Sequence, residues 1–277
     1  MKKTIGIIGG DERSVFLKEC LEQDDYVVKT FGVFEDDYTN LEEFLRGTIY
    51  VVGGIPFSRD DYTINMPNCK NKVSVENLFN SMKECKNLVA GSFSENIKLL
   101  AEKHNIKLYD FLDDEDFTIY NAIPTAEGAI KIAIEEHSGT IHSSKSLILG
   151  FGRIGKVLAD MIKGLNGNVY VAARKKEVFA WIKTMGYIPV SYKDLPTILP
   201  KTDILFNTVP SLLIKKEELM VMKKDSLIID LASKPGGIDF EIAKELGIKT
   251  NWALGLPGKV SPKSVAQYMM EKIKNID

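Results

Sequence analysis

One stretch near the middle of the chain limits the possible folds more than any other. The apolar run Leu147–Leu149 leads directly into a G-x-G-x-x-G loop, with glycines at 150, 152 and 155. In such a loop the first glycine permits a tight turn, the second lets a pyrophosphate approach the backbone, and the third lets the following helix pack closely on the strand. Free N–H groups at the start of that helix favour phosphate. The sequence therefore predicts a dinucleotide site at Gly150, Gly152, Arg153, Ile154 and Gly155.

The next predicted strand, Asn168–Ala172, indicates which dinucleotide binds. NAD-binding domains carry an Asp or Glu about 20 residues beyond the glycine loop, where it binds the ribose 2′-hydroxyl. Here the strand is followed by Arg174 and Lys175 instead. A carboxylate would repel a 2′-phosphate, whereas a guanidinium binds it with two hydrogen bonds. We therefore expect NADP rather than NAD.

Three further segments are expected to line the nicotinamide half of the cofactor cleft. Ligands of open parallel sheets lie beyond the carboxyl ends of the strands. Two segments follow predicted strands, and a loop at 255–260 precedes the last helix and is expected to close over the ring. The candidate residues are Asn207, Val209, Pro210, Leu231, Pro257 and Gly258.

Short apolar runs alternate with amphipathic helical patterns along the whole chain of 277 residues. This alternation is typical of parallel sheets covered by helices, and the length suggests two domains. The predicted strands include Thr4–Ile8, Val27–Phe31, Ile204–Asn207, Leu227–Asp230 and a shorter one near Lys249–Trp252.

We expect an α/β protein with two doubly wound parallel-sheet domains. Residues 1–120 form a flavodoxin- or Rossmann-like substrate domain, 121–140 an interdomain helix, 141–258 a Rossmann NADP-binding domain, and 259–277 a C-terminal helix that packs back on the first domain. Thr125 is expected to cap the interdomain helix at its N-terminus, and Ser138-Gly139 to end it. Ser261-Pro262 is a typical helix start, with proline at the first helical position.

Charge and cysteine content exclude several classes of protein. The net charge of −2 gives no basic surface for nucleic acid and no polybasic face for a membrane. The three scattered cysteines have no metal-ligand spacing, so we expect reduced thiols and no metal site. The apolar run after Lys2-Lys3 is too short for a signal peptide, and no segment approaches the roughly 20 apolar residues of a membrane span. A cytoplasmic protein is expected.

The first domain has its own candidate site. Gly9-Gly10-Asp11-Glu12-Arg13 follows the first strand, without the third glycine of a dinucleotide loop. Arg13 would then stand at a helix N-terminus beside a cleft, where it is suited to bind a substrate carboxylate. The alternative is that Asp11 only caps a helix while Arg13 lies in solvent.

Several segments together resemble the A-subunit family of dipicolinate synthases from endospore-forming bacteria. They are GGDER at 9–13, NAIPTAEG at 121–128, the glycine loop with Arg153, DLAS at 230–233 with PGG at 235–237, and ALGLPGK at 253–259. The likeness runs through both predicted domains in order. No motif is matched between about 35 and 72.

The resemblance implies an NADP-linked oxidation of dihydrodipicolinate to dipicolinate, on a branch of the lysine pathway, in the mother cell of a sporulating bacterium. It also implies a partner, the flavoprotein-like B-subunit of dipicolinate synthase, and an oligomer. The substrate carries two carboxylates, so Arg13, Thr125, Ser233 and Lys234 are candidate ligands. Glu127 would orient Arg13 or accept a proton, and Glu127 and Lys234 are the candidate catalytic residues.

Other functions stay open. A 2-hydroxy-acid dehydrogenase has a similar plan but needs a histidine acid/base after the glycine loop. All three histidines, at 104, 137 and 142, precede Gly150. A shikimate-type dehydrogenase shares the NADP fold, but its lysine constellation is not found in the first domain. A non-catalytic, NADP-sensing regulatory protein would keep the loop and show no turnover.

Overall fold

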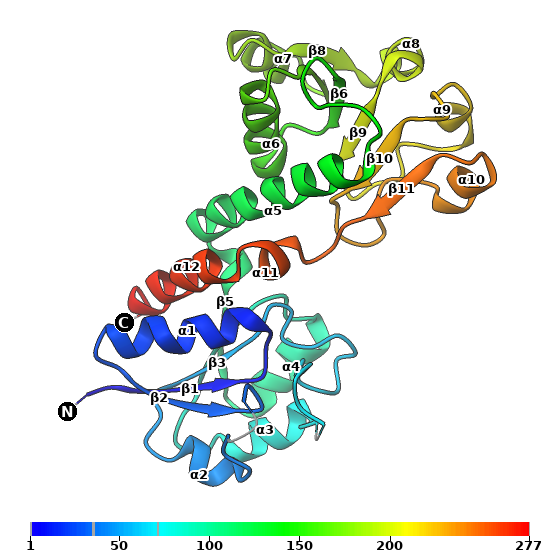
Figure 1. Ribbon diagram of the computed structural model, residues 1–277. Helices are drawn as coiled ribbons and strands as arrows, with labels where there is room; N and C mark the ends of the chain where they lie inside the picture. The colour runs from blue at the N-terminus through cyan, green and yellow to red at the C-terminus, as the bar shows by residue number, and fades with distance from the viewer. Residues whose placement is uncertain (1, 35–36, 71, 277) are drawn as a thin grey trace. The chain divides into compact units, whose positions relative to one another are not determined.

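The computed structural model describes residues 2–34, 37–70 and 72–276, which form two compact units (Figure 1). Unit 1 comprises Met1–Asn121 and Ser261–Asp277, and unit 2 comprises Ala122–Val260. Each unit is built on one parallel sheet with helices on both faces. The predicted α/β class with two doubly wound sheets is confirmed.

The sheet of unit 1 has five parallel strands in the order β2-β1-β3-β4-β5. The strands are β1 Thr4–Ile8, β2 Val27–Phe31, β3 Tyr50–Gly53, β4 Asn87–Ala90 and β5 Lys107–Asp110. The helices are α1 Glu12–Gln23, α2 Leu41–Leu45, α3 Val75–Ser81, α4 Glu95–Lys103 and α12 Pro262–Lys274, with a 3₁₀ turn at Phe111–Asp113. Because β1 has β2 on one side and β3 on the other, the strand order reverses between β1 and β3.

Alternating side chains of this sheet fill two separate cores, as the pleat of a strand requires. Ile7 and Val52 point to the core beneath α1 and α12. Their neighbours Ile8 and Val51 point to the opposite core, beneath α2, α3 and α4. Burial on both faces therefore fixes the register of these strands.

The C-terminal helix α12 is part of unit 1, although all of unit 2 separates it in sequence from the rest of that unit. Its buried residues Val265 and Met269 pack in one core with Leu17 and Leu21 of α1. Near its C-terminal end, Lys272 forms an ion pair with Asp114. Proline stands at the first helical position, as the sequence predicts.

The sheet of unit 2 has six parallel strands in the order β11-β10-β9-β6-β7-β8. The strands are β6 Lys145–Leu149, β7 Asn168–Ala173, β8 Ile188–Ser191, β9 Ile204–Asn207, β10 Leu227–Asp230 and β11 Lys249–Trp252. The helices are α6 Arg153–Gly164, α7 Lys176–Thr184, α8 Leu195–Ile198, α9 Lys216–Met220, α10 Phe240–Glu245 and α11 Leu256–Val260, with 3₁₀ turns at Tyr192–Asp194 and Leu199–Lys201. Here the strand order reverses between β6 and β9.

The long helix α5, Glu115–Glu136, begins in unit 1 and covers one face of the sheet of unit 2. Its Ala126, Ala129 and Ala133 are fully buried in the same core as Ile148 of β6. At Gly128 an added Cβ would lie 3.0 Å from Cβ of Leu256. Small residues along α5 therefore let α11 pack closely against it.

The predicted start of this helix is wrong. Thr125 is not a helix N-cap, because α5 begins ten residues earlier and continues through Pro124. The cap is Asp114, whose carboxylate accepts a hydrogen bond of 2.8 Å from the backbone N–H of Phe117. Proline costs one backbone hydrogen bond inside a helix, and here the buried alanines that follow keep the helix intact. The helix spans 115–136 instead of the predicted 121–140.

Two other local predictions differ from the structure. The segment expected to be a loop at 255–260 contains the short helix α11, in which Leu256, Pro257 and Gly258 are buried. Strand β8 has no counterpart among the predicted strands, because Ile188–Ser191 carries a proline and only one fully buried side chain.

Two absences concern the described part of the chain, residues 2–34, 37–70 and 72–276. No helix there is long and apolar enough to cross a bilayer. No group of three acidic, histidine or cysteine side chains in those ranges is placed to bind a metal ion.

Candidate functional site

The glycine loop of unit 2 lies where the strand order reverses. Gly150 follows β6, and Thr208 follows the neighbouring strand β9. The N–H of Thr208 and its hydroxyl both donate to the carbonyl of Leu149, at 3.0 and 2.8 Å. In open α/β sheets, ligands bind outside the carboxyl ends of the strands at such a reversal. The structure therefore presents the loop at the position that a dinucleotide site requires.

The three glycines of this loop meet different surroundings. Gly150 has a φ of +96°, and an added Cβ would lie 2.6 Å from Oγ1 of Thr208. At Gly155 an added Cβ would lie 2.3 Å from the carbonyl oxygen of Gly150. At Gly152, by contrast, an added Cβ would meet no described atom within 4 Å. Packing thus does not require glycine at position 152, and the open space above it fits a pyrophosphate at the start of α6.

A buried amide–carboxylate pair joins the ends of β9 and β10. Asn207 and Asp230 are both 0% exposed, and Nδ2 of Asn207 donates to Oδ1 of Asp230 at 2.7 Å. The same Nδ2 donates to the carbonyl of Val209, whose N–H donates back to Oδ1 of Asn207. The amide of Asn207 is therefore used inside the protein. Asn207, a predicted cofactor ligand, shapes the loop that carries Val209 and Pro210.

The loop after β10 is held from both sides, and it presents Ser233 and Lys234. The Asp230 carboxylate accepts hydrogen bonds from the N–H groups of Ala232 (3.0 Å) and Gly237 (2.8 Å). The indole of Trp252 donates to the carbonyl of Ala232 at 3.0 Å. Between these anchors Ser233 and Lys234 are exposed. Exposed hydroxyl and ammonium groups on a fixed loop are suited to bind an anion.

Leu231, another predicted cofactor residue, stands at the start of this loop. Its side chain is buried in the core beneath α5. Its N–H donates to the carbonyl of Asn207 at 2.8 Å. Leu231 therefore anchors the loop to the sheet, and its side chain does not reach the surface that carries Ser233.

At the end of β7 the structure places positive charge on the surface. Arg174 and Lys175 are exposed between β7 and α7. The guanidinium carbon of Arg174 lies 5.9 Å from the ring centroid of Tyr192, which follows β8. Burial raises the pKa of the Tyr192 phenol, against the opposing charge of Arg174. The ring restricts the directions that Arg174 can take.

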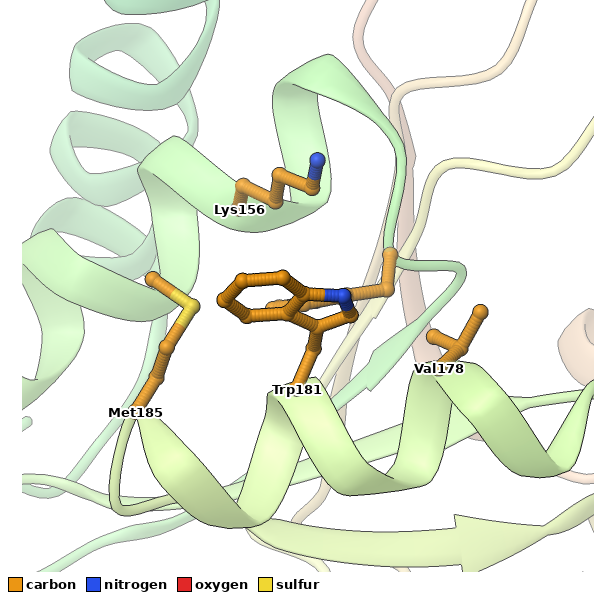
Figure 2. Close-up of a pocket in the computed structure, with 5 residues that line it drawn as sticks. Lys156, Val178, Trp181 and Met185 are labelled. Atoms are coloured by element: carbon orange, nitrogen blue, oxygen red, sulfur yellow. The ribbon is translucent and has the colours of Figure 1, made fainter.

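A pocket of about 320 Å³ lies between α6 and α7 (Figure 2). Val178 and Trp181 of α7 and Met185, just after α7, line it on one side, and Phe151 and Lys156 line it on the other. The Trp181 side chain is 66% exposed. Phe151 stands between Gly150 and Gly152, so the pocket adjoins the glycine loop, but none of the predicted cofactor ligands lines it.

Four other predicted residues of unit 2 lie on helices. Thr125 is buried and Glu127 is exposed, both in the middle of α5. Pro257 and Gly258 are buried in α11, so they pack against the protein and do not form a loose cover. Of the predicted carboxylate ligands, Thr125, Ser233 and Lys234 thus belong to unit 2, and Arg13 belongs to unit 1.

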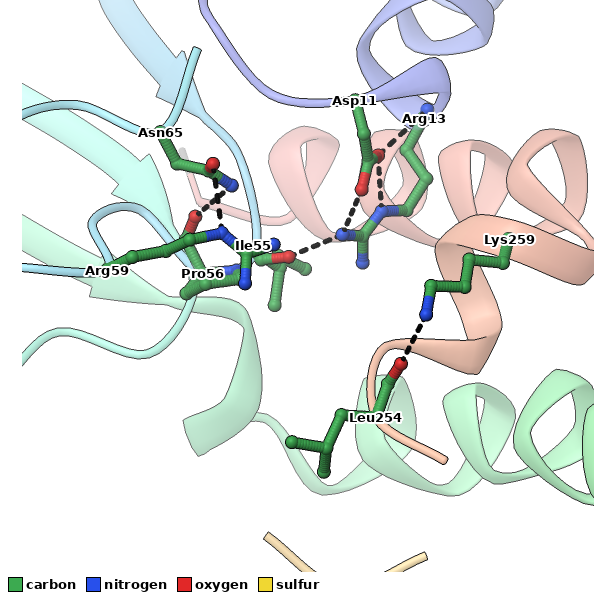
Figure 3. Close-up of polar contacts among 8 residues, drawn as sticks. All are labelled: Asp11, Arg13, Ile55, Pro56, Arg59, Asn65, Leu254 and Lys259. Atoms are coloured by element: carbon green, nitrogen blue, oxygen red, sulfur yellow. Dashed lines mark hydrogen bonds and ion pairs between the residues drawn. The ribbon is translucent and has the colours of Figure 1, made fainter. Parts of the chain in front are cut away.

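Arg13 is buried at the carboxyl end of β1, so it does not lie in solvent (Figure 3). Asp11 caps α1 by accepting the N–H of Arg13, and its carboxylate also accepts from Nε at 2.8 Å and Nη2 at 2.7 Å. Nη2 also donates to the carbonyl of Ile55. Burial raises the pKa of Asp11, but the hydrogen bonds and charge of Arg13 outweigh it, so this pKa is below its usual range.

Gly10, which follows β1, and Gly54, which follows β3, bring the ends of these two strands into contact beside Arg13. An added Cβ at Gly54 would lie 2.8 Å from Cα of Gly10, and the N–H of Gly10 donates to the carbonyl of Asn65 at 2.8 Å. Gly9 and Gly10 have positive φ angles, which L side chains rarely adopt. The reversal of strand order in unit 1 is therefore occupied by a closely packed pair of loops.

Several residues of both sites have no predicted role. Asp230 stands within a matched motif but has no role assigned from the sequence. A carboxylate at the end of a strand could have suggested that it holds the following loop. Tyr192 and Thr208 carry no motif, because they act through neighbours that only the sheet order brings together. Arg59 and Asn65 fall within 35–72, where no motif is matched; residues 35, 36 and 71 of that range lie outside the described part.

Comparison with known proteins gives independent information on both units. Residues 4–112 match the family model of the N-terminal domain of the dipicolinate synthase A-subunit. Residues 125–235 match the NAD-binding domain of D-isomer-specific 2-hydroxyacid dehydrogenases. Unit 2 therefore contains a nicotinamide-dinucleotide-binding domain of the dehydrogenase type.

A curated relative agrees with these domain matches. The dipicolinate synthase A-subunit of Bacillus subtilis strain 168 is 38% identical over 188 residues. The matched region covers 68% of this chain and 62% of the relative, which is less than two thirds of the relative's length.

Solved structures extend the likeness over the whole chain. The A-subunit of Bacillus halodurans dipicolinate synthase is 29% identical, with a TM-score of 0.90, over 99% of this chain and 97% of that one. The A chain of the Bacillus subtilis enzyme gives 29% and 0.87, over 100% and 96%. With these matches in both units, the chain is a relative of the dipicolinate synthase A-subunits, and residues 4–112 carry the N-terminal domain of that family.

Proposed function

We propose that the chain is the redox-active component of a dipicolinate synthase, which oxidises dihydrodipicolinate to dipicolinate with NADP. The observation that carries this proposal is the strand-end site of unit 2. There, the glycine loop leaves open space above Gly152, and Arg174 and Lys175 take the place of an acid after β7. The name of the 38% identical relative supports the choice of reaction.

The preference for NADP rests on charge at the end of β7. A 2′-phosphate carries negative charge that an exposed guanidinium binds with paired hydrogen bonds. Arg174 is already restricted by the Tyr192 ring, so less side-chain entropy is lost on binding. With Lys175 beside it, this surface favours the phosphorylated dinucleotide over NAD.

The proposed roles follow from the positions of the residues. The glycine loop, Val209 and Pro210 hold the dinucleotide, and the nicotinamide ring supplies a hydride acceptor at its C4. Arg13 on unit 1 binds a substrate carboxylate, and Thr125, Ser233 and Lys234 on unit 2 are the other candidate carboxylate ligands. Glu127 is exposed on α5 and takes up the ring proton that leaves with the hydride, while Lys234 stabilises negative charge. Because the product ring is aromatic, the protein mainly has to orient the reactants.

The family resemblance supports further parts of the proposal. The chain acts in the cytoplasm of a sporulating mother cell, on a branch of the lysine pathway. It works with the flavoprotein-like B-subunit and as an oligomer. The match to the B. subtilis relative, whose name describes one component of a larger enzyme, supports a multi-component assembly.

A 2-hydroxy-acid dehydrogenase is the second candidate, favoured by the family match over residues 125–235. That reaction needs an imidazole acid/base after the glycine loop, and this chain has no histidine beyond His142. Tests with lactate- or glyoxylate-type substrates separate the two candidates directly. We expect no nicotinamide turnover with either.

The cofactor preference is tested with Arg174→Gln. We expect about tenfold weaker binding of NADP and unchanged binding of NAD, because only the 2′-phosphate loses a charged partner. Isothermal titration calorimetry measures both. The matched control is Lys201→Gln, an exposed cation that precedes β9, at the amino ends of the strands. Equal losses for both dinucleotides in Arg174→Gln contradict the assignment.

The reaction itself is tested by mixing the protein with NADP and enzymatically generated dihydrodipicolinate, with and without the B-subunit. Appearance of NADPH absorbance in either mixture supports the proposal. A protein that binds NADP but forms no NADPH under both conditions is the regulatory protein of the remaining alternative.

A further inference from the structure

Unit 1 holds a second arginine next to the Arg13 site. Nε of Arg59 donates to Oδ1 of Asn65 at 3.2 Å, and Nδ2 of Asn65 donates to the carbonyl of Pro56 at 3.1 Å. Arg13 donates to the carbonyl of the preceding residue, Ile55. Two guanidinium groups are therefore tied to successive carbonyls of the same loop, one directly and the other through Asn65 (Figure 3).

The position of this loop in the sheet points to a ligand. The loop follows β3, and Arg13 follows β1, the two strands between which the order of unit 1 reverses. Ligands of doubly wound sheets bind outside the strand ends at such a reversal. The backbone there is also fixed, because Asn65 accepts the N–H of Gly10 and donates back to Pro56.

Both guanidinium groups keep nitrogens available for a ligand. Asp11 and Ile55 use Nε and Nη2 of Arg13, and Nη1 has no partner among the described residues. Figure 3 shows this third nitrogen directed away from Asp11. In the same part of the chain, Arg59 uses only Nε, so both of its terminal nitrogens are open. Asp11 and Ile55 hold one edge of the Arg13 guanidinium, and Asn65 holds one edge of the Arg59 guanidinium. The other edge of each guanidinium is available to a ligand.

Nearby acids do not neutralise Arg59. Its neighbour Asp60 turns back on its own loop and accepts from the N–H groups of Tyr62 and Thr63 at 2.9 and 2.7 Å and from the hydroxyl of Thr63 at 2.8 Å. These bonds hold the pKa of Asp60 well below its usual range. Asp61 accepts from Asn96 at 3.1 Å. The guanidinium of Arg59 therefore keeps its positive charge toward an anion.

We propose that Arg59 is a second carboxylate ligand, and that Arg13 and Arg59 together bind the two carboxylates of a ring dicarboxylate on unit 1. This inference rests on the proposed function and adds a residue that determines specificity. Arg13 binds one carboxylate, which both monocarboxylates and dicarboxylates carry. Arg59 binds the other and selects dicarboxylates over monocarboxylates. Asn65 is a positioning residue, because it acts on the ligand only through Arg59.

The test compares binding of dipicolinate and of picolinate, which lacks one carboxylate, by calorimetry without a cofactor. In the unmodified protein we expect dipicolinate to bind about tenfold more tightly, the value of one charge-assisted hydrogen-bonded contact. In Arg59→Gln this ratio falls to about one, because dipicolinate binding weakens and picolinate binding does not. Arg59→Lys, which keeps the charge without the planar fork, restores part of the ratio.

Arg46→Gln is the matched control. Arg46 is also exposed on unit 1, but it precedes β3 and so lies at the amino ends of the strands. We expect its ratio to equal that of the unmodified protein. A full ratio in Arg59→Gln overturns the inference, as does a failure of the unmodified protein to bind dipicolinate.

The failure of this inference is distinguishable from failure of the proposed function. NADPH formation from dihydrodipicolinate by the unmodified protein establishes the reaction whatever Arg59 does. If that reaction occurs and the ratio in Arg59→Gln is unchanged, only the role of Arg59 is wrong. If dipicolinate binds with an Arg59-dependent ratio and no NADPH forms, the binding site stands and the redox assignment falls.

Discussion

At the scale of single residues, two glycines of the loop differ in whether packing requires them. Gly155 is required by the fold, because an added Cβ would lie 2.3 Å from a backbone oxygen. Gly152 has an ordinary φ of −83° and no described atom near its missing side chain. Packing therefore requires glycine at position 155 and not at position 152, and substitution by alanine tests the proposed binding role of Gly152.

We expect Gly152→Ala to change the free energy of unfolding by less than about 0.5 kcal/mol and to weaken NADP binding about tenfold or more. Gly155→Ala is the companion variant, expected to lose about 1–3 kcal/mol of stability because the backbone has to shift. Thermal unfolding and calorimetric titration give the two quantities. Unimpaired NADP binding by Gly152→Ala is incompatible with a pyrophosphate above this residue.

At the scale of elements, α12 makes an essential contribution to the core of unit 1. Val265, Ala266, Met269 and Ile273 are at most 2% exposed and pack in the core with α1. We expect Met269→Ala to lower the free energy of unfolding of unit 1 by about 2–5 kcal/mol, through lost burial and the cavity left behind.

Gln267 provides the control for this helix, since it lies two residues away and is exposed. Gln267→Ala should stay within about 0.5 kcal/mol of the unmodified protein. Urea unfolding followed by circular dichroism measures both variants. Equal effects of the two substitutions would mean that α12 does not pack on α1 in solution.

At the scale of the whole molecule, unit 2 is inserted into unit 1. The chain leaves unit 1 after Asn121 and returns at Ser261, and each unit has its own sheet and its own pair of cores. We expect two calorimetric transitions. NADP at a hundredfold excess over its Kd should stabilise the unit 2 transition by about 2.7 kcal/mol.

Met269→Ala should move the other transition and leave this one in place. A single transition that responds equally to NADP and to Met269→Ala contradicts independent units. Sodium sulfate, an anion without a nucleotide, serves as the ligand control and should not reproduce the shift of the unit 2 transition selectively.

The sheets are largely predictable from the sequence because most of their strands are short apolar runs buried on both faces. Strands β1, β2, β9, β10 and β11 have the predicted bounds. Strand β8 has no predicted counterpart because Pro189 interrupts its run of four residues, whereas the edge strands β2 and β11 carry no proline. The predicted start of α5 is wrong because a proline in a long helix looks locally like a helix boundary, and only the packing of α5 on the sheet of unit 2 overrides it.

The site is predictable where one local motif contains all the chemistry. The proposed roles of the glycine loop and of Arg174 rest on residues adjacent in sequence, so a local pattern is enough to suggest them. The proposed role of Arg59 could not be suggested in this way, because Arg59 is held by Asn65 and its relation to Arg13 arises only when β1 and β3 pair in the sheet. The buried bond between Asn207 and Asp230 depends in the same way on the order of β9 and β10.

The exposure of Arg174 has a consequence for substitutions at this position. The residue follows β7 on the surface and has its aromatic contact with Tyr192, while the buried cores are made by other residues. A substitution at position 174 is therefore expected to leave the buried cores and the fold intact. On the proposed role of Arg174, a substitution there changes the dinucleotide preference while the protein stays folded.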